Sequence, residues 1–266
     1  MEDRHFPALD QNPMCEGLGL FWGIYDGFSF DHSSGAIVAQ CAADNLHIKI
    51  KEAVLSGFAN PVPGWDMKIG IRDGYLQTDL TVLSLPRNVG KFAGGTTAAS
   101  VIIREGTIYT SNAGDSRVVA CGVGNAIRVS HDHKPSDSDE KERITSAGGC
   151  VGESGRLYGM IAVSRGFGAW EWKHGDKPKL ISADPYVNVL PCEDIDFLVI
   201  ASDGLWCVKG DQDVVNSINT QMVNIEVTAK TISLAQCEEI TQRLVNRALE
   251  AFSPDNITVT VIFFRR

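Results

Sequence analysis

The chain has 266 residues, of which 44% are hydrophobic and 21% are charged, a composition typical of a soluble globular protein. Its 24 Lys and Arg residues against 33 Asp and Glu residues give a formal net charge of −9. This acidic balance argues against nucleic-acid binding and against attachment to an anionic membrane surface. No apolar run is long enough to span a membrane, and no signal-peptide pattern opens the chain. We therefore expect a cytoplasmic protein, with the nucleus as the alternative.

The cysteines and histidines give no sign of a soft-metal site. The seven cysteines are odd in number, scattered and without CxxC spacing, which is typical of reduced thiols inside a cell. The six histidines also lack the spacing of zinc ligands. His131 and His133 flank Asp132, and we interpret both as ordinary loop residues.

The first predicted elements are a strand and a helix. The apolar run Phe21–Tyr25 predicts a strand that ends at Asp26-Gly27, and the pattern over Ala36–Val54 predicts a helix. The stretch from Phe58 to Asn88 contains three prolines with glycines between them. We expect loops around one short helix in this stretch.

Three β-rich runs occupy the middle of the chain, at Ala98–Arg104, Thr107–Ser111 and Arg117–Gly122. They are separated by turn residues at Glu105-Gly106 and Asn112–Ser116. Such tight connections are typical of antiparallel strands.

The second half of the chain adds helices and two further strands. Glu140–Ala147 predicts a short helix ended by Gly148-Gly149. Ile195–Ala201 predicts a strand buried on both faces, and Ile257–Phe264 predicts the last strand. A helical spacing just before this strand joins six apolar residues: Ile240, Leu244, Val245, Ala248, Leu249 and Phe252. With no repeat or long linker, we expect one domain over residues 1–266, of layered α+β class, with helices flanking an antiparallel sandwich.

An aspartate follows or opens three of these strands. Asp26 follows the first strand, Asp203 follows Ile195–Ala201 directly after Ser202, and Asp255 opens the terminal strand. Each aspartate alone is more typical of a turn or a cap. Together they indicate a metal site, because two carboxylates about 4 Å apart repel by roughly 4 kcal/mol at an effective dielectric of 20. Oxygen ligands of this kind suit Mg²⁺ or Mn²⁺.

The ordered motifs of the chain resemble those of the PP2C-type, metal-dependent serine/threonine protein phosphatases. The resemblance covers nearly the whole chain. It rests on Met1-Glu2-Asp3, Phe21 to Gly27, Gly95-Thr96-Thr97-Ala98, Asn112 to Arg117, Asp132-His133-Lys134-Pro135, Glu142-Arg143-Ile144, Ala147-Gly148-Gly149, Gly155-Arg156-Leu157, Ala162 to Gly168, Ala201 to Trp206 and Asp255-Asn256.

The resemblance implies a fold, a reaction and a set of ligands. The fold would be an α/β/β/α sandwich of two antiparallel sheets, and the substrates phosphorylated proteins. Asp26, Asp203 and Asp255 would be catalytic carboxylates that hold two Mn²⁺ or Mg²⁺ ions, with help from the Gly27 carbonyl and Glu2. A metal-activated water would attack phosphorus in line. The resemblance also assigns Asp132 to a further metal, although a turn or cap role is open, and we expect a monomer.

Four departures from the family pattern lie at its chemistry. Phe28 occupies the position of the family's proposed general acid, a histidine. His32 lies a few residues further on as a candidate substitute, but its position is more typical of a solvated histidine at the start of a helix. Cys207 replaces an acidic residue, and the matching residues Ser202 to Trp206 before it favour loss of a metal ligand over the alternative of a small buried residue beside Trp206. Ala169 also replaces an acid, and the sequence starts at Met1, after the position of the family's phosphate-binding arginine.

The sequence therefore supports two hypotheses. The first is a metal-dependent protein serine/threonine phosphatase with impaired chemistry, and it rests on the three retained aspartates. The second is a pseudophosphatase that acts as a regulatory binding module, and it rests on Phe28, Cys207 and the missing arginine. The segment Asn112–Arg117 is expected to be structural, with Asp115 and Arg117 holding their neighbours.

Overall fold

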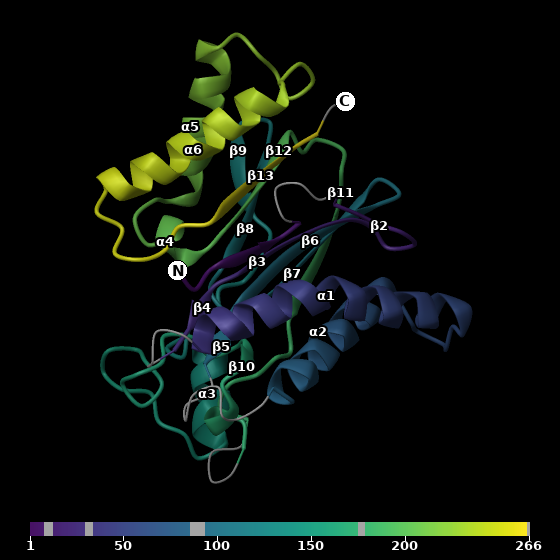
Figure 1. Ribbon diagram of the computed structural model, residues 1–266, viewed down its shortest axis with the longest axis vertical. Helices are drawn as coiled ribbons and strands as arrows, with labels where there is room; N and C mark the ends of the chain where they lie inside the picture. Colours follow the sequence, from purple (N-terminus) through teal and green to yellow (C-terminus); the bar gives the residue numbers. More distant parts are fainter. Residues whose placement is uncertain (8–12, 30–33, 86–93, 175–178, 265–266) are drawn as a thin grey trace.

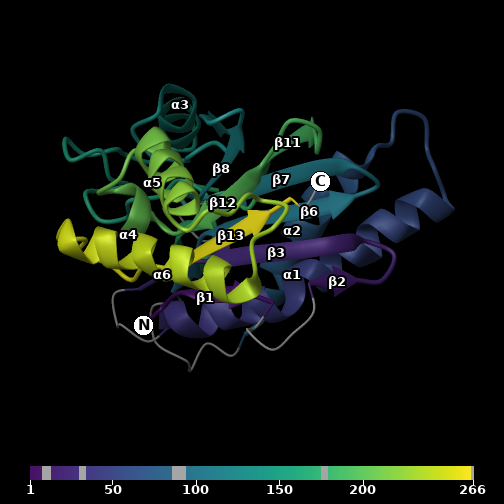
Figure 2. The same ribbon diagram turned by 90° about the horizontal axis from the view of Figure 1, so that it is seen from above.

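Two antiparallel sheets packed face to face form the centre of the protein, and helices cover both outer faces (Figure 1). The computed structural model describes residues 1–7, 13–29, 34–85, 94–174 and 179–264. Figure 2 shows the same layers from above. The α+β class and the α/β/β/α layering predicted from the sequence are confirmed.

The first sheet has the order β1-β3-β6-β7-β11, with β2 paired to β3. Its strands are β1 (Arg4–Phe6), β2 (Met14–Cys15), β3 (Gly19–Tyr25), β6 (Ala98–Arg104), β7 (Thr107–Ala113) and β11 (Tyr186–Pro191). The second sheet has the order β13-β12-β8-β9. Its strands are β8 (Arg117–Gly122), β9 (Asn125–Arg128), β12 (Phe197–Ala201) and β13 (Val259–Phe263).

Helices form the outer layers. The first sheet is covered by α1 (Ser34–Ala59) and α2 (Met67–Leu83), and the second by α4 (Asp203–Trp206), α5 (Asp211–Asn224) and α6 (Leu234–Glu250). A smaller part beyond the first sheet holds β4 (Gly27–Phe28), β5 (Gly95–Thr96), β10 (Phe167–Gly168), the helix α3 (Ser138–Ser146) and a 3₁₀ turn, η1 (Trp170–Trp172). In the described ranges, no helix is long and apolar enough to cross a membrane.

Strand β12 shows why the sheets stack. Leu198 and Ile200 face the first sheet, whereas Phe197 and Val199 face the helices on the other side. All five residues of the strand are buried. A strand in which every residue is apolar therefore has a core on both faces, because side chains alternate along a strand. The sequence prediction of a doubly covered strand here is confirmed.

The expected loop-rich stretch instead contains the 17-residue helix α2, so that expectation was wrong. The Asp66 side chain caps its first turn by accepting a hydrogen bond from the Ile69 N–H. Its glycines are contact points with α1: a β-carbon on Gly74 would lie 2.6 Å from the Ile50 Cα. Glycines that resemble helix breakers in the sequence thus allow two helices to approach closely. Residues 86–88 of the stretch lie outside the described ranges.

Two further expectations need correction. The turn at Glu105-Gly106 does join paired strands, but β7 and β8 lie in different sheets, so Asn112–Ser116 is not a hairpin. Gly114, with φ at +114°, lies at this crossing. In the last helix, Ile240, Leu244 and Ala248 of the predicted apolar spacing are buried, whereas Leu249, also in α6, is 56% exposed. Phe252 lies beyond the end of α6 and is 90% exposed.

Candidate metal centre

The ends of β3, β12 and β13 bring the three predicted aspartates together. Asp26 follows β3, Asp203 begins α4 just after β12, and Asp255 lies shortly before β13. Ala201 pairs with Val259, so the segments around Asp203 and Asp255 run side by side. A β-carbon on Gly204 would lie 2.0 Å from the Asn256 carbonyl oxygen, which shows how closely these segments pack.

The pKa shifts of these aspartates indicate that their carboxyl groups lie near one another. The pKa of Asp26 lies well above its ordinary value because the group is buried, and the charges of Asp3, Asp203, Asp115 and Asp255 raise it further. Burial also raises the pKa of Asp203 to about 6, with Asp115 as the next cause. These acids therefore repel when all are ionised.

This donor set fits a hard divalent cation. One oxygen of Asp203 and one of Asp3 are buried without a hydrogen-bond partner in the described part of the chain. Buried carboxylate oxygens are paired or bound to metal in stable proteins, and Mg²⁺ and Mn²⁺ prefer such ligands. No group of three or more His, Cys, Asp or Glu side chains among the described residues is already arranged to hold a metal ion. The acids are gathered, but their side chains do not form a closed cage.

Glu2 and Gly27 frame the same place. The Glu2 N–H donates to the Asn256 Oδ1 at 2.8 Å, and Ser29 Oγ donates to Glu2 Oε1 at 2.7 Å. A β-carbon on Gly27 would lie 2.8 Å from the Glu2 carbonyl oxygen. Only glycine leaves room for this approach. Both residues thus lie at the cluster, as the resemblance implies, and their metal roles stay predictions.

Sequence reasoning missed two contributors to the cluster. Asp3 is 4% exposed and accepts a hydrogen bond from Ser202 Oγ at 2.8 Å. Asp115, predicted to be structural, is 3% exposed, forms an ion pair with Lys134 and raises the pKa of Asp203. The signal for Asp3 was its place directly after Glu2. Nothing in the local sequence places Asp115 near Asp203, because the two belong to different segments of the fold.

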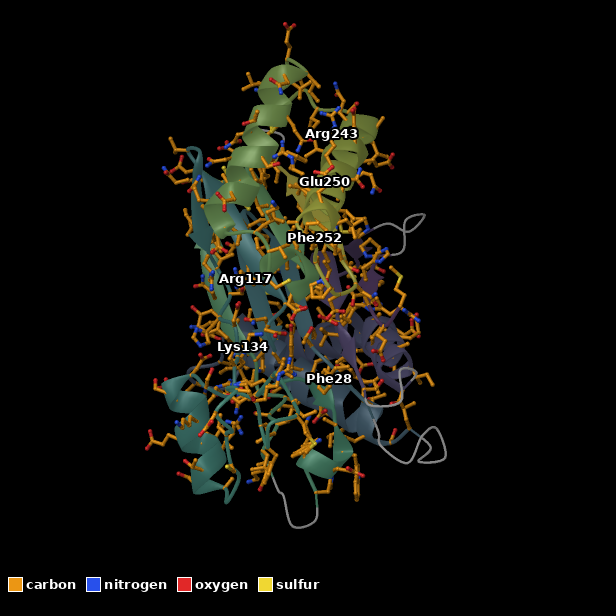
Figure 3. All side chains as sticks on the ribbon, turned by 90° about the vertical axis from the view of Figure 1, so that its left-hand side faces the viewer. Phe28, Arg117, Lys134, Arg243, Glu250 and Phe252 are labelled. Atoms are coloured by element: carbon orange, nitrogen blue, oxygen red, sulfur yellow. The ribbon has the colours of Figure 1, made fainter. Side chains whose placement is uncertain are left out.

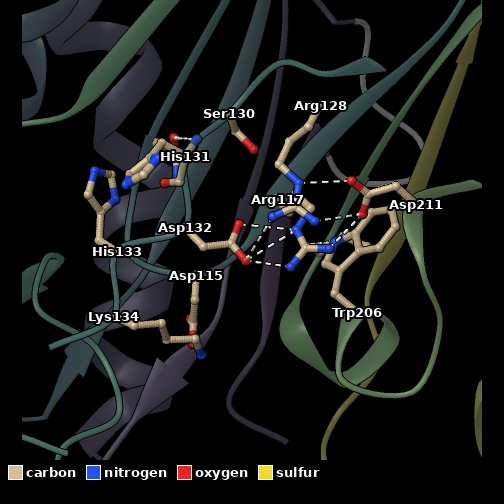
Figure 4. A network of polar contacts seen from close by, with 12 residues as sticks. Asp115, Arg117, Arg128, Ser130, His131, Asp132, His133, Lys134, Trp206 and Asp211 are labelled. Carbon is tan, nitrogen blue, oxygen red and sulfur yellow. Dashed lines mark hydrogen bonds and ion pairs between the residues drawn. The ribbon is translucent and has the colours of Figure 1, made fainter. Parts of the chain in front are cut away.

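Asp132 is paired with an arginine rather than left open for a cation (Figure 4). Its carboxylate accepts hydrogen bonds from the Arg117 guanidinium, which also donates to Asp211 Oδ1 at 2.6 Å. The guanidinium carbon lies 5.2 Å from the centre of the Trp206 ring, on α4. Arg128 Nε donates to the second oxygen of Asp211 at 2.8 Å. The predicted metal role of Asp132 stays a prediction, and a metal there would compete with Arg117.

Replacing Arg117 with Gln is expected to destabilise the fold by about 2–3 kcal/mol, because two carboxylates that are 15% and 18% exposed lose their more buried partner and keep only Arg128, which is 45% exposed. Chemical denaturation at pH 7 measures the change. The matched control is Arg128→Gln, whose side chain is 45% exposed, and its loss should amount to less than about 1 kcal/mol. Equal losses of stability in the two variants would contradict the prediction that Arg117 is the main partner of Asp132 and Asp211.

The departures at Phe28, Cys207 and Ala169 differ in their surroundings. Phe28 is half-buried, packs against the apolar cluster that includes Ile144, and lies so close to Gly95 that a β-carbon there would be 2.3 Å from the ring. Figure 3 places Phe28 below Lys134. Ala169 is 1% exposed in the same apolar cluster. Cys207 is exposed, so the alternative of a buried packing residue is wrong. His32 lies outside the described residues.

His133 supplies a pH-dependent element next to this site. Burial, followed by the charge of Arg165, lowers its pKa to about 4, below the ordinary 6.5. Because the unfolded chain then binds the proton more tightly, stability is full above pH 6.5 and is lost as the pH falls toward 4.

In the His133→Gln variant, the decrease in folding stability between pH 7 and pH 4 should therefore be smaller by up to about 3 kcal/mol. Urea unfolding at each pH measures the effect. His131→Gln changes the exposed histidine of the same segment and should alter the pH profile far less, because the charge of His131 is only the smallest of the influences on the pKa of His133. The same profile in all three proteins would contradict a buried neutral His133.

Comparisons with known proteins agree with this fold. The family description "Protein phosphatase 2C" matches residues 1–257. The chain is 32% identical to "Probable protein phosphatase 2C 30" of Arabidopsis thaliana over 98% of its own length and 62% of that protein's length. It is 34% identical to "Protein phosphatase 1B" of Rattus norvegicus, over 99% of this chain and 67% of the relative. The chain thus spans less than two thirds of the Arabidopsis relative.

A solved structure shows the same fold. The serine-threonine phosphatase 2C from Toxoplasma gondii superposes with a TM-score of 0.74 at 21% identity, covering 99% of this chain and 90% of that one. The layered sandwich of this chain is thus the fold of that phosphatase structure. This chain belongs to the protein phosphatase 2C family.

Proposed function

We propose that the chain is a metal-dependent phosphatase that hydrolyses phosphoserine and phosphothreonine in proteins. The observation that supports this most is the group of aspartates around Asp26, which includes the buried Asp3 and Asp115. Burial and these acidic neighbours raise the pKa of Asp26. A protein without a cation for these groups would carry their repulsion with no benefit. Two Mn²⁺ or Mg²⁺ ions, when bound, would supply positive charge for the phosphoryl oxygens and acidify a water.

The chain's own residues would have distinct tasks in this reaction. Asp26, Asp203 and Asp255, with Glu2 and the Gly27 carbonyl, would hold the cations, and Ser29 and Asn256 would hold Glu2 in place. Phe28 cannot donate a proton. The leaving alkoxide would then take its proton from solvent, and the expected turnover is low.

The position of Phe28 favours a second function, that of a regulatory binding module without turnover. Its ring packs on Gly95 and on an apolar cluster, so a hydrophobic surface stands where the family has its general acid. This second proposal keeps the metal ions as structural elements and removes the chemical step.

Release of phosphate from a phosphothreonine peptide separates the two proposals. The measurement is made with Mn²⁺, with Mg²⁺ and with EDTA, and metal binding is followed by calorimetry on the same sample. Turnover that requires the cation supports the phosphatase. Metal binding without any turnover supports the binding module, and the absence of both would remove the metal centre from the proposal.

A further inference from the structure

A pocket of about 400 Å³ lies between α4, α5 and α6, on the outer face of the second sheet. Its size falls within the range of small-molecule sites. Its base is apolar: Leu205, Val214 and Leu244 are at most 2% exposed. None of the residues that line it belongs to the carboxylate cluster.

The rim of the pocket carries two cations and one acid. Lys209 follows α4, Arg247 lies on α6, and Asp213 lies in the first turn of α5. Arg247 Nη1 donates to Ser217 Oγ at 2.8 Å. Within the described ranges, neither Lys209 nor Arg247 forms an ion pair with a carboxylate. Two unpaired cations are notable at one pocket of a chain with net charge −9.

We propose that this pocket binds a small amphipathic organic anion, with its charged head at Lys209 and Arg247 and its apolar part on Leu205 and Leu244. The two cations and the Ser217 hydroxyl would hold the head, because hydrogen bonds to a charged group are the stronger kind. The apolar base would take the tail out of water. Asp213 disfavours the anion, so its removal should tighten binding. This site goes beyond the proposed phosphatase function and does not depend on it.

The pocket and the carboxylate cluster share the short helix α4. Leu205, in its base, belongs to the four-residue helix α4 that begins at Asp203. The next residue, Trp206, is 7% exposed, and its indole N–H donates to the Ala201 carbonyl at 3.0 Å. The indole proton of Trp206 is therefore a reporter of changes at α4 that needs no activity measurement.

Octanoate, octylammonium and acetate test the proposal by nuclear magnetic resonance titration of the Mg²⁺-loaded protein. Octanoate should shift the Trp206 indole signal with a saturable curve. Octylammonium should bind less well because it lacks the negative head, and acetate because it lacks the tail. Arg247→Gln should weaken octanoate binding by about 10-fold or more, whereas Asp213→Asn should strengthen it.

The matched control is Arg243→Gln, one turn before Arg247 on α6; Figure 3 labels Arg243. Its side chain pairs with Glu239 and does not line the pocket. Its affinity for octanoate should stay within about 2-fold of the parent protein, since it lies outside the site. Equal losses of octanoate affinity in the Arg243 and Arg247 variants would show that binding depends only on the surface charge of the protein, and would overturn the proposed site. Octylammonium binding as tight as octanoate binding, or no saturable shift, would overturn it as well.

Discussion

Asp203→Asn is expected to lower Mn²⁺-dependent turnover of a phosphothreonine peptide by more than about 100-fold. Loss of a group that only supports a metal ligand already costs about 10–100-fold, and Asp203 is predicted to be a ligand itself. The metal-free variant should at the same time be more stable than the metal-free parent at pH 7.5. The gain should be about 2 kcal/mol, because burial and Asp115 raise the pKa of Asp203 to about 6 and Asn carries no charge.

The sign of this stability gain follows from proton linkage. A carboxyl whose folded pKa exceeds its unfolded pKa of about 3.9 destabilises the folded state above the folded pKa. The advantage of Asp203→Asn should therefore shrink as the pH falls through 6 and vanish near pH 4. Comparing the two proteins removes the opposing contribution of His133, which both contain.

Asp196→Asn is the control for this experiment, because Asp196 is an exposed acid just before the opposite end of β12. It should change neither turnover nor the pH profile. Unchanged turnover in Asp203→Asn would remove the proposed metal centre. Lost turnover with reduced stability at pH 7.5 would instead indicate that other groups already stabilise the negative charge of Asp203 in the metal-free fold.

Phe28→His is expected to raise turnover on a phosphothreonine peptide by about 100-fold, the lower end of what general acid catalysis contributes. The gain should be small on p-nitrophenyl phosphate. The alkoxide of threonine is strongly basic and needs a proton as it leaves, whereas nitrophenolate is stable without one. Steady-state kinetics on the two substrates at pH 7 measure the difference.

The substitution also disturbs packing, so a second variant is needed. The Phe28 ring packs on Gly95 and on an apolar cluster, and a smaller polar ring should destabilise the fold by about 1–3 kcal/mol. Phe28→Leu keeps an apolar side chain, leaves a similar gap and cannot donate a proton. It should give no kinetic gain. Equal gains on both substrates in Phe28→His would contradict a missing general acid.

Several elements of this fold could be predicted from the sequence because their signals are local. Strand β12 follows from a continuous apolar run, and α6 from apolar spacing, since both reflect burial of neighbouring residues. The link between Asp26, Asp203 and Asp255 could also be inferred, because each lies near the end of a strand that the apolar pattern predicts. The resemblance added Glu2 and Gly27, which the structure places at the same cluster.

Other features were decided only by the tertiary structure. The sheet to which β8 belongs, the role of glycines in α2 and the presence of Asp115 beside Asp203 all depend on segments that meet in space. The partner of Asp132 is the clearest case. Arg117 lies 15 residues before it and also pairs with Asp211, 94 residues further along the chain. The sequence determined which side chains stand at strand ends, but pairing of charges depends on distance in the folded chain, which only the packing of the two sheets sets.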